Sequence, residues 1–185
     1  MALTKSIAEE LGTPIPSFEL ESVDGTTYRV KDFEAARVLV VLFICNHCPY
    51  ARAVEGRIIA LARDYRGKGA QVVGICSNDP TDYPDDAPPR LLERWRRKNY
   101  GFPYLVDWTQ DVARAFGAVC TPDIFVYDAE RKLAYRGRID DNWQDASKVT
   151  RHDLRDAIEA LLAGGRPSAE QVPSMGCSIK WSKGS

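Results

Sequence analysis

Two cysteines stand where a strand-like segment gives way to a helix-like one. The apolar run over residues 38–44 is rich in valine and leucine, which predicts a strand buried on both faces. Cys45-Asn46-His47-Cys48 follows this run directly, and apolar residues then recur at helical spacing over residues 49–68. Such a junction holds two sulfurs close together beside a helix N-terminus, whose partial positive charge stabilises a thiolate. The pair therefore predicts a dithiol–disulfide site.

The rest of the chain alternates between strand-like and helix-like segments. A hairpin is expected within residues 15–33, around a turn at Asp24-Gly25. Further strands are expected at 71–77, 102–106, 123–127 and 132–139, and further helices at 88–98, 109–118 and 152–163. This order predicts an α/β fold with a central mixed sheet, helices on both faces, an N-terminal hairpin and a mid-chain insert over 78–98. We expect a single domain over residues 1–185, with a core over about 14–165 and an irregular tail over 166–185.

Composition excludes several classes of partner and location. The formal net charge of −1 gives no electrostatic reason to bind nucleic acid or an anionic membrane. No apolar run approaches the roughly 20 residues of a membrane span, and the first residues lack the apolar core of a secretory signal, so a cytoplasmic location is expected. Five cysteines in a chain of 185 residues favour catalytic or metal-binding thiols over structural disulfides in a reducing compartment. No cofactor and no bound metal is predicted.

A second landmark supports a resemblance to a known family. Cys120-Thr121-Pro122 precedes the strand-like segment 123–127. Together with the Cys-x-x-Cys junction, this resembles the thioredoxin fold, and the resemblance implies a cis-proline at Pro122 packed against the active-site sulfurs. The hairpin and insert resemble the AhpC/TSA and TlpA-like branch of that superfamily. The blocks FICNHCPY at 43–50 and GCSIKW at 176–181 resemble a bacterial group of thioredoxin-family or AhpC/TSA-family proteins.

The residues suggest a thiol–disulfide oxidoreductase. Cys45 is the expected nucleophile, with a pKa below the ordinary value of about 8.5, and Cys48 would resolve the mixed disulfide. His47 resembles the histidine of the oxidising relatives DsbA and protein disulfide isomerase; when protonated it would stabilise the thiolate. We therefore predict a reduction potential more oxidising than the roughly −270 mV of thioredoxin. The alternative for His47 is an exposed side chain without a role.

Four further residues are candidates at or near this site. Thr121 and Pro122 are expected to dock an extended substrate, although an ordinary turn would have the same sequence. The expected partners are protein or peptide disulfides and an upstream thiol reductant. Cys120 is either a third redox cysteine or a space-filling residue. Cys177 could resolve a sulfenic acid, pair with Cys120, or be a packed cysteine of the tail.

Departures from the related families leave two other functions open. Thioredoxin's buried acid corresponds to Leu39, so proton transfer at Cys48 would need water or another group. Peroxiredoxins carry Pro-x-x-x-Thr-x-x-Cys; aligned on Cys48, this motif meets Val41 and Cys45, and the missing threonine disfavours a thiol peroxidase. The third possibility is a binding protein whose cysteines hold zinc or are idle. The remaining zinc-ligand candidates are dispersed along the chain: Cys76, Cys120, His152 and Cys177. The sequence predicts neither the physiological substrate nor the oligomeric state.

Overall fold

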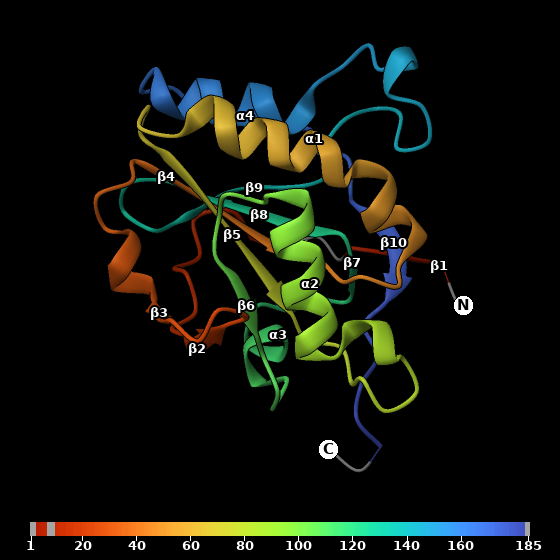
Figure 1. Ribbon diagram of the computed structural model, residues 1–185. Coiled ribbons are helices and arrows are strands. Elements are labelled where there is room, and N and C mark those ends of the chain that lie inside the picture. Colours follow the sequence, from red (N-terminus) through yellow and green to blue (C-terminus); the bar gives the residue numbers. More distant parts are fainter. Residues whose placement is uncertain (1–2, 7–9, 184–185) are drawn as a thin grey trace.

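A seven-stranded mixed sheet forms the centre of the molecule, in the order β3-β2-β6-β5-β4-β8-β9 (Figure 1). The computed structural model describes residues 3–6 and 10–183. The strands of this sheet are β2 (Glu19–Ser22), β3 (Thr27–Arg29), β4 (Val38–Phe43), β5 (Ala70–Cys76), β6 (Tyr104–Val106), β8 (Asp123–Tyr127) and β9 (Leu133–Arg136). The helices are α1 (Pro49–Tyr65), α2 (Pro88–Lys98), α3 (Asp111–Ala115) and α4 (Asp153–Leu162), with 3-10 turns η1 (Val30–Phe33), η2 (Pro84–Asp86) and η3 (Ala146–Lys148).

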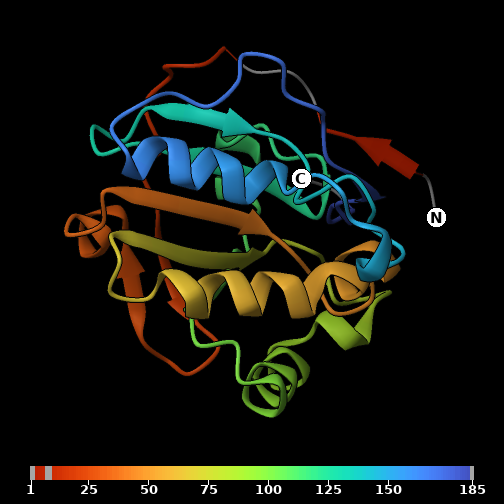
Figure 2. The same ribbon diagram turned by 90° about the horizontal axis from the view of Figure 1, so that it is seen from above.

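Strand β4 lies at the middle of the sheet, and all six of its residues are buried. It runs parallel to β5 and antiparallel to β8. Its side chains alternate between two apolar cores, and α1, α2 and α4 pack on one core while α3 and η1 pack on the other. Figure 1 and Figure 2 show α1 and α4 side by side over the first face, where Arg155 of α4 pairs with Asp64 of α1 at 2.8 Å. The predicted mixed sheet with helices on both faces is confirmed.

Three short strands lie outside the predictions. A second sheet contains β1 (Leu3–Lys5), β10 (Met175–Ser178) and β7 (Cys120–Thr121), with β10 in the middle. The prediction of a wholly irregular tail over 166–185 is therefore wrong at residues 175–178. The segment is too short and too poor in apolar residues to show a strand period, and only its pairing with β1 and β7 makes it a strand.

The insert after β5 folds back against α1. Glu55 of α1 accepts two hydrogen bonds from Arg94 of α2, at 2.5 and 2.8 Å, and one from the Tyr100 hydroxyl at 2.7 Å. Leu91 of α2 is fully buried in the core beneath them. These contacts fix the insert next to the start of α1, where the two cysteines lie. None of the described helices is long and apolar enough to cross a membrane.

Candidate active site

Cys48 caps the N-terminus of α1. The helix starts at Pro49, where the missing N–H costs nothing because the first-turn donors have no partner within the helix. The Cys48 sulfur lies 2.9 Å from the Thr121 carbonyl oxygen, and the Ala51 backbone N–H in the first turn of α1 helps to lower the pKa of Cys48. The N–H favours a thiolate, and the carbonyl oxygen suits a thiol that donates its proton. The surroundings of Cys48 therefore accommodate both protonation states.

Thr121 lies against both sulfurs of the Cys-x-x-Cys pair. Its hydroxyl oxygen is 3.3 Å from the Cys45 sulfur, and its carbonyl oxygen is 2.9 Å from the Cys48 sulfur. The peptide bond from Thr121 to Pro122 is cis, as the resemblance implied. Both residues are buried, and Thr121 faces Cys177 of β10 across the small sheet. Strand β10 thus occupies one side of the loop where we expected an extended substrate to dock.

The two active-site thiols have opposite pKa shifts. A hydrogen bond donated by the Cys45 thiol, helped by Thr121 and the Ala51 N–H, lowers the pKa of Cys48 to about 4. Burial, the bond to Cys48 and the nearby Asp86 carboxylate raise the pKa of Cys45 well above its usual value. The prediction of a lowered pKa at Cys45 is therefore wrong. The helix begins after Cys48, so its positive end acts on that sulfur, while a buried carboxylate faces the other.

His47 is held by Asp86, a residue of the insert that sequence analysis missed. The His47 Nδ1 is 2.5 Å from one Asp86 carboxylate oxygen and 3.7 Å from the Cys45 sulfur. Because the carboxylate can only accept, we assign the proton to Nδ1. The imidazole is 10% exposed and stacks on Tyr83 of the insert at 4.5 Å, so the alternative of an exposed histidine is wrong.

Asp86 also organises the backbone of the active-site loop. It accepts hydrogen bonds from the Asn46 N–H at 2.7 Å, the His47 N–H at 3.2 Å and the Asn78 side-chain amide at 2.9 Å. Its side chain is fully buried. An acid near the dithiol thus exists, although it comes from the insert and not from the position of Leu39. Four aspartates occur in the polar segment 78–89, and nothing in the sequence singles out the one that turns inward.

The other cysteines fall into two groups. Cys177 hydrogen-bonds Cys48 and joins the site. Cys120 is fully buried, and its thiol lies 3.6 Å from the Pro122 carbonyl oxygen, while Cys76 ends β5 in the core. Burial raises the pKa of both Cys120 and Cys76. Inert packing accounts for these two residues better than redox chemistry does.

One group among the described residues has the spacing of a metal site. The ligand atoms of Cys45, His47 and Asp86 lie within 4.8 Å of one another. Structural zinc sites are closed by four protein ligands, whereas this group offers three and joins two of them by a hydrogen bond. Of the dispersed zinc candidates, none belongs to this group. The absence of a bound metal stays a prediction.

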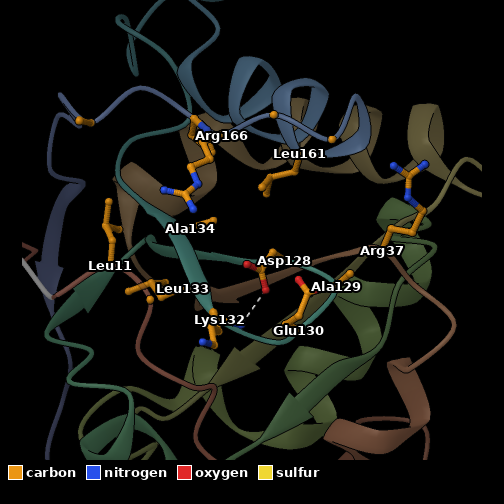
Figure 3. Close-up of a pocket in the computed structure, with 15 residues that line it drawn as sticks. Leu11, Arg37, Asp128, Ala129, Glu130, Lys132, Leu133, Ala134, Leu161 and Arg166 are labelled. Carbon is orange, nitrogen blue, oxygen red and sulfur yellow. Dashed lines mark hydrogen bonds between the residues drawn. The ribbon is translucent and has the colours of Figure 1, made fainter.

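A large cavity lies away from the dithiol. It measures about 760 Å³ and opens at the start of β4, between Arg37 and the turn at Asp128–Lys132, whereas Cys45 follows the other end of that strand (Figure 3). A smaller cavity of about 200 Å³ lies beside the cis-proline. It is lined by Pro122, by the contacting rings of Tyr50 and Trp143, and by Arg138 and other residues of the β9–α4 connection. Neither cavity is lined by Cys45 or Cys48, but the smaller one reaches Pro122, which follows Thr121 beside the two sulfurs.

Comparison with known proteins gives the family. The family model described as AhpC/TSA family matches residues 11–136, which include the dithiol, the insert and the cis-proline. The chain belongs to the AhpC/TSA family. No curated protein matches it. The solved structure of an uncharacterized conserved protein from Geobacillus kaustophilus is 41% identical, with a TM-score of 0.95, and the match covers 100% of this chain and 99% of that one.

More distant solved structures share the fold of this AhpC/TSA protein. A thiol:disulfide interchange protein from Chlorobium tepidum has a TM-score of 0.59 at 23% identity, over 70% of this chain and 87% of that one. Peroxidoxin BcpB from Mycobacterium tuberculosis has a TM-score of 0.57 at 23% identity, over 69% and 84%. At these identities the likeness shows the fold, and the predicted thioredoxin-like fold is confirmed. Both a thiol:disulfide interchange protein and a peroxidoxin are thus among the structural neighbours of the chain.

Proposed function

We propose that this AhpC/TSA protein is a thiol–disulfide oxidoreductase that exchanges disulfides through Cys45 and Cys48. One observation carries the proposal: the Cys45 thiol donates a hydrogen bond to Cys48, and Thr121 contacts both sulfurs. Two sulfurs in contact close a disulfide with little movement. Cys45 is 6% exposed and Cys48 is fully buried, so an incoming disulfide meets Cys45 first.

The shared proton makes the first step feasible despite the raised pKa of Cys45. As the Cys45 sulfur attacks a substrate disulfide, its proton passes to Cys48 along the existing hydrogen bond. One substrate thiolate leaves, and the other half of the substrate stays on Cys45 as a mixed disulfide. The Cys48 thiol so formed lies 2.9 Å from the Thr121 carbonyl oxygen, which accepts its proton in a hydrogen bond.

The second step closes the internal disulfide. Cys48 gives its proton to the departed thiolate and then, as a thiolate, attacks Cys45; the bond from Cys45 to the substrate breaks, and the second half of the substrate leaves as a thiolate that takes a proton from water. An upstream thiol reductant then restores the dithiol by the reverse route. The low pKa of Cys48 stabilises the reduced state, which supports the predicted oxidising potential, now through Cys48 and not Cys45. Protein or peptide disulfides are the proposed substrates, and the cavity beside Pro122 is their proposed apolar subsite.

A thiol peroxidase is the second candidate, because Cys48 has the low pKa that peroxidases need and aligns with their cysteine. Against it, Cys48 is fully buried and Cys45 replaces the threonine. A zinc-binding protein is the third, on the group formed by Cys45, His47 and Asp86. Its prediction is stoichiometric zinc in the purified protein.

Differential alkylation with mass spectrometry distinguishes these candidates. The reduced protein is mixed with a peptide disulfide or with hydrogen peroxide, and its cysteines are mapped over time. We expect a rapid Cys45–Cys48 disulfide with the peptide and a slow reaction with peroxide. Preference for peroxide would replace the proposal with the peroxidase, and unreactive thiols in both experiments would leave the zinc-binding protein.

A further inference from the structure

Strand β10 carries Cys177 into the active site. Cys177 lies opposite Thr121 on one side and opposite Leu3 of β1 on the other. The chain beyond β10 is held as well: the Ile179 N–H donates to the Val119 carbonyl at 3.0 Å, and the Lys180 N–H donates to the Asn78 side chain at 2.8 Å. Cys177 is therefore fixed by pairing on both sides of its strand.

Gly176 allows β10 to approach the cis-proline loop closely. A Cβ atom added at Gly176 would lie 1.9 Å from the Thr121 carbonyl oxygen and 3.2 Å from the Pro122 ring. No other residue fits without displacing the strand. The same carbonyl oxygen contacts Cys48, so the closeness of β10 to Thr121 brings the next residue, Cys177, to that sulfur.

Cys48 has a sulfur neighbour on each side. The Cys45 thiol donates to it from the active-site loop, and both the backbone N–H and the side chain of Cys177 hydrogen-bond it from β10. Cys120, by contrast, is opposite Ser178 and has its thiol near the Pro122 carbonyl oxygen. Cys48 thus interacts with the sulfurs of both Cys45 and Cys177.

We propose that Cys177 is a third redox thiol, which attacks Cys48 in the Cys45–Cys48 disulfide and forms a buried Cys48–Cys177 disulfide. The proposal rests on the proposed thiol–disulfide function, which supplies the first disulfide. The step is an exchange and needs no further oxidant. The Cys177 thiolate forms the new bond to Cys48, the Cys45–Cys48 bond breaks, and Cys45 leaves as a thiolate that takes up the proton lost by Cys177.

One hydrogen-bond donor is available beside the leaving sulfur. The Cys45 sulfur lies 3.3 Å from the Thr121 hydroxyl, which can donate to the thiolate released there, whereas the His47 Nδ1–H already donates to Asp86. In the reduced protein, burial and contact with the Cys48 thiolate raise the pKa of Cys177 to about 12. Once Cys48 is in a disulfide it carries no charge, so that part of the increase disappears while the nearby Lys180 still lowers the pKa of Cys177.

The exchange separates storage of the disulfide from access to substrate. Cys48 and Cys177 are 0% and 1% exposed, whereas Cys45 is the most exposed of the three. An oxidised molecule in the second form keeps its disulfide away from solvent thiols and presents a free thiol at Cys45. The same protein can then engage another disulfide before it is reduced.

The test is to trap Cys45 in the oxidised protein. The full chain is oxidised with oxidised glutathione, freed of excess reagent and incubated with iodoacetamide, and its disulfides are mapped under non-reducing conditions. Alkylation removes the Cys45 thiolate from the exchange equilibrium. The oxidised protein should therefore convert over time to a form with alkylated Cys45 and a Cys48–Cys177 disulfide. Cys177→Ala should lose this labelling and keep Cys45–Cys48, while the matched variant Cys120→Ala should label as the wild type does.

Each result decides between the two proposals. An oxidised wild type that keeps Cys45–Cys48 and gains no label overturns the third thiol but not the proposed function. Equal labelling in Cys177→Ala and the wild type overturns it too. A map that contains Cys48–Cys177 at all times and never Cys45–Cys48 overturns the proposed pair instead. The wild-type time course needs no variant, so a misfolded Cys177→Ala does not prevent a decision.

Discussion

Asp86→Asn tests whether the insert organises the dithiol. The Asn side-chain oxygen can keep the two bonds from the Asn46 and His47 backbone N–H groups. The Asn nitrogen, however, replaces the carboxylate oxygen that accepts from His47 Nδ1 at 2.5 Å and from the Asn78 amide at 2.9 Å. The His47 Nδ1–H and the Asn78 amide would then both face the new amide nitrogen, which is itself a donor. An unsatisfied buried donor costs about 1–3 kcal/mol, and a lost hydrogen bond to a charged group costs about 1.5–3 kcal/mol.

We therefore expect the reduced Asp86→Asn variant to lose about 3 kcal/mol of unfolding free energy, measured by urea denaturation. For a chain of this size, that loss lowers Tm by about 6–12 °C. Removing the carboxylate should also lower the pKa of Cys45, so that iodoacetamide labels Cys45 at lower pH than in the wild type. Asp85→Asn is the matched control, because that side chain is exposed. Equal stability and equal labelling of the two variants would refute this role of Asp86.

Three further predictions follow from the same geometry. The pKa of Cys48 is about 4 in the folded protein and higher in the unfolded chain. The difference in unfolding free energy between the reduced wild type and Cys48→Ala should therefore increase as the pH rises from about 4 to 9. A difference that does not change with pH would contradict a Cys48 thiolate in the folded protein. Gly176→Ala should destabilise the protein, because the added Cβ would lie 1.9 Å from the Thr121 carbonyl oxygen of β7. Gly56→Ala, which adds a Cβ in open space on α1, should stabilise the protein by about 0.5–1 kcal/mol in the same denaturation assay. Equal effects of the two substitutions would contradict the close packing of β10 on β7. Trp143→Ala should raise KM for a peptide disulfide about tenfold at unchanged kcat, which corresponds to ~1.4 kcal/mol of lost binding free energy. Trp108→Ala, at an exposed position, should leave KM unchanged. If neither substitution changed KM, the substrate would bind elsewhere than in the cavity beside Pro122.

Local patterns account for most of the fold. The apolar run over 38–44 became the fully buried β4, and the helical spacing after it became α1, each within a few residues of its predicted ends. These elements are readable because burial on one or two faces imposes a regular period on the sequence. β10 has no such period: it is a strand because β1 and β7, more than 50 residues away, supply its hydrogen bonds.

The sequence by itself determined that Cys45 and Cys48 lie together at a strand–helix junction, because residues so close in the chain at the end of a buried strand have little freedom. That Thr121 and Pro122 lie beside them was implied by the resemblance to the thioredoxin fold. The tertiary structure alone decided which sulfur has the low pKa. That depends on charges and hydrogen bonds from the start of α1, from Asp86 in the insert and from Cys177 in the tail, and their distances to the two sulfurs are set only when the chain folds.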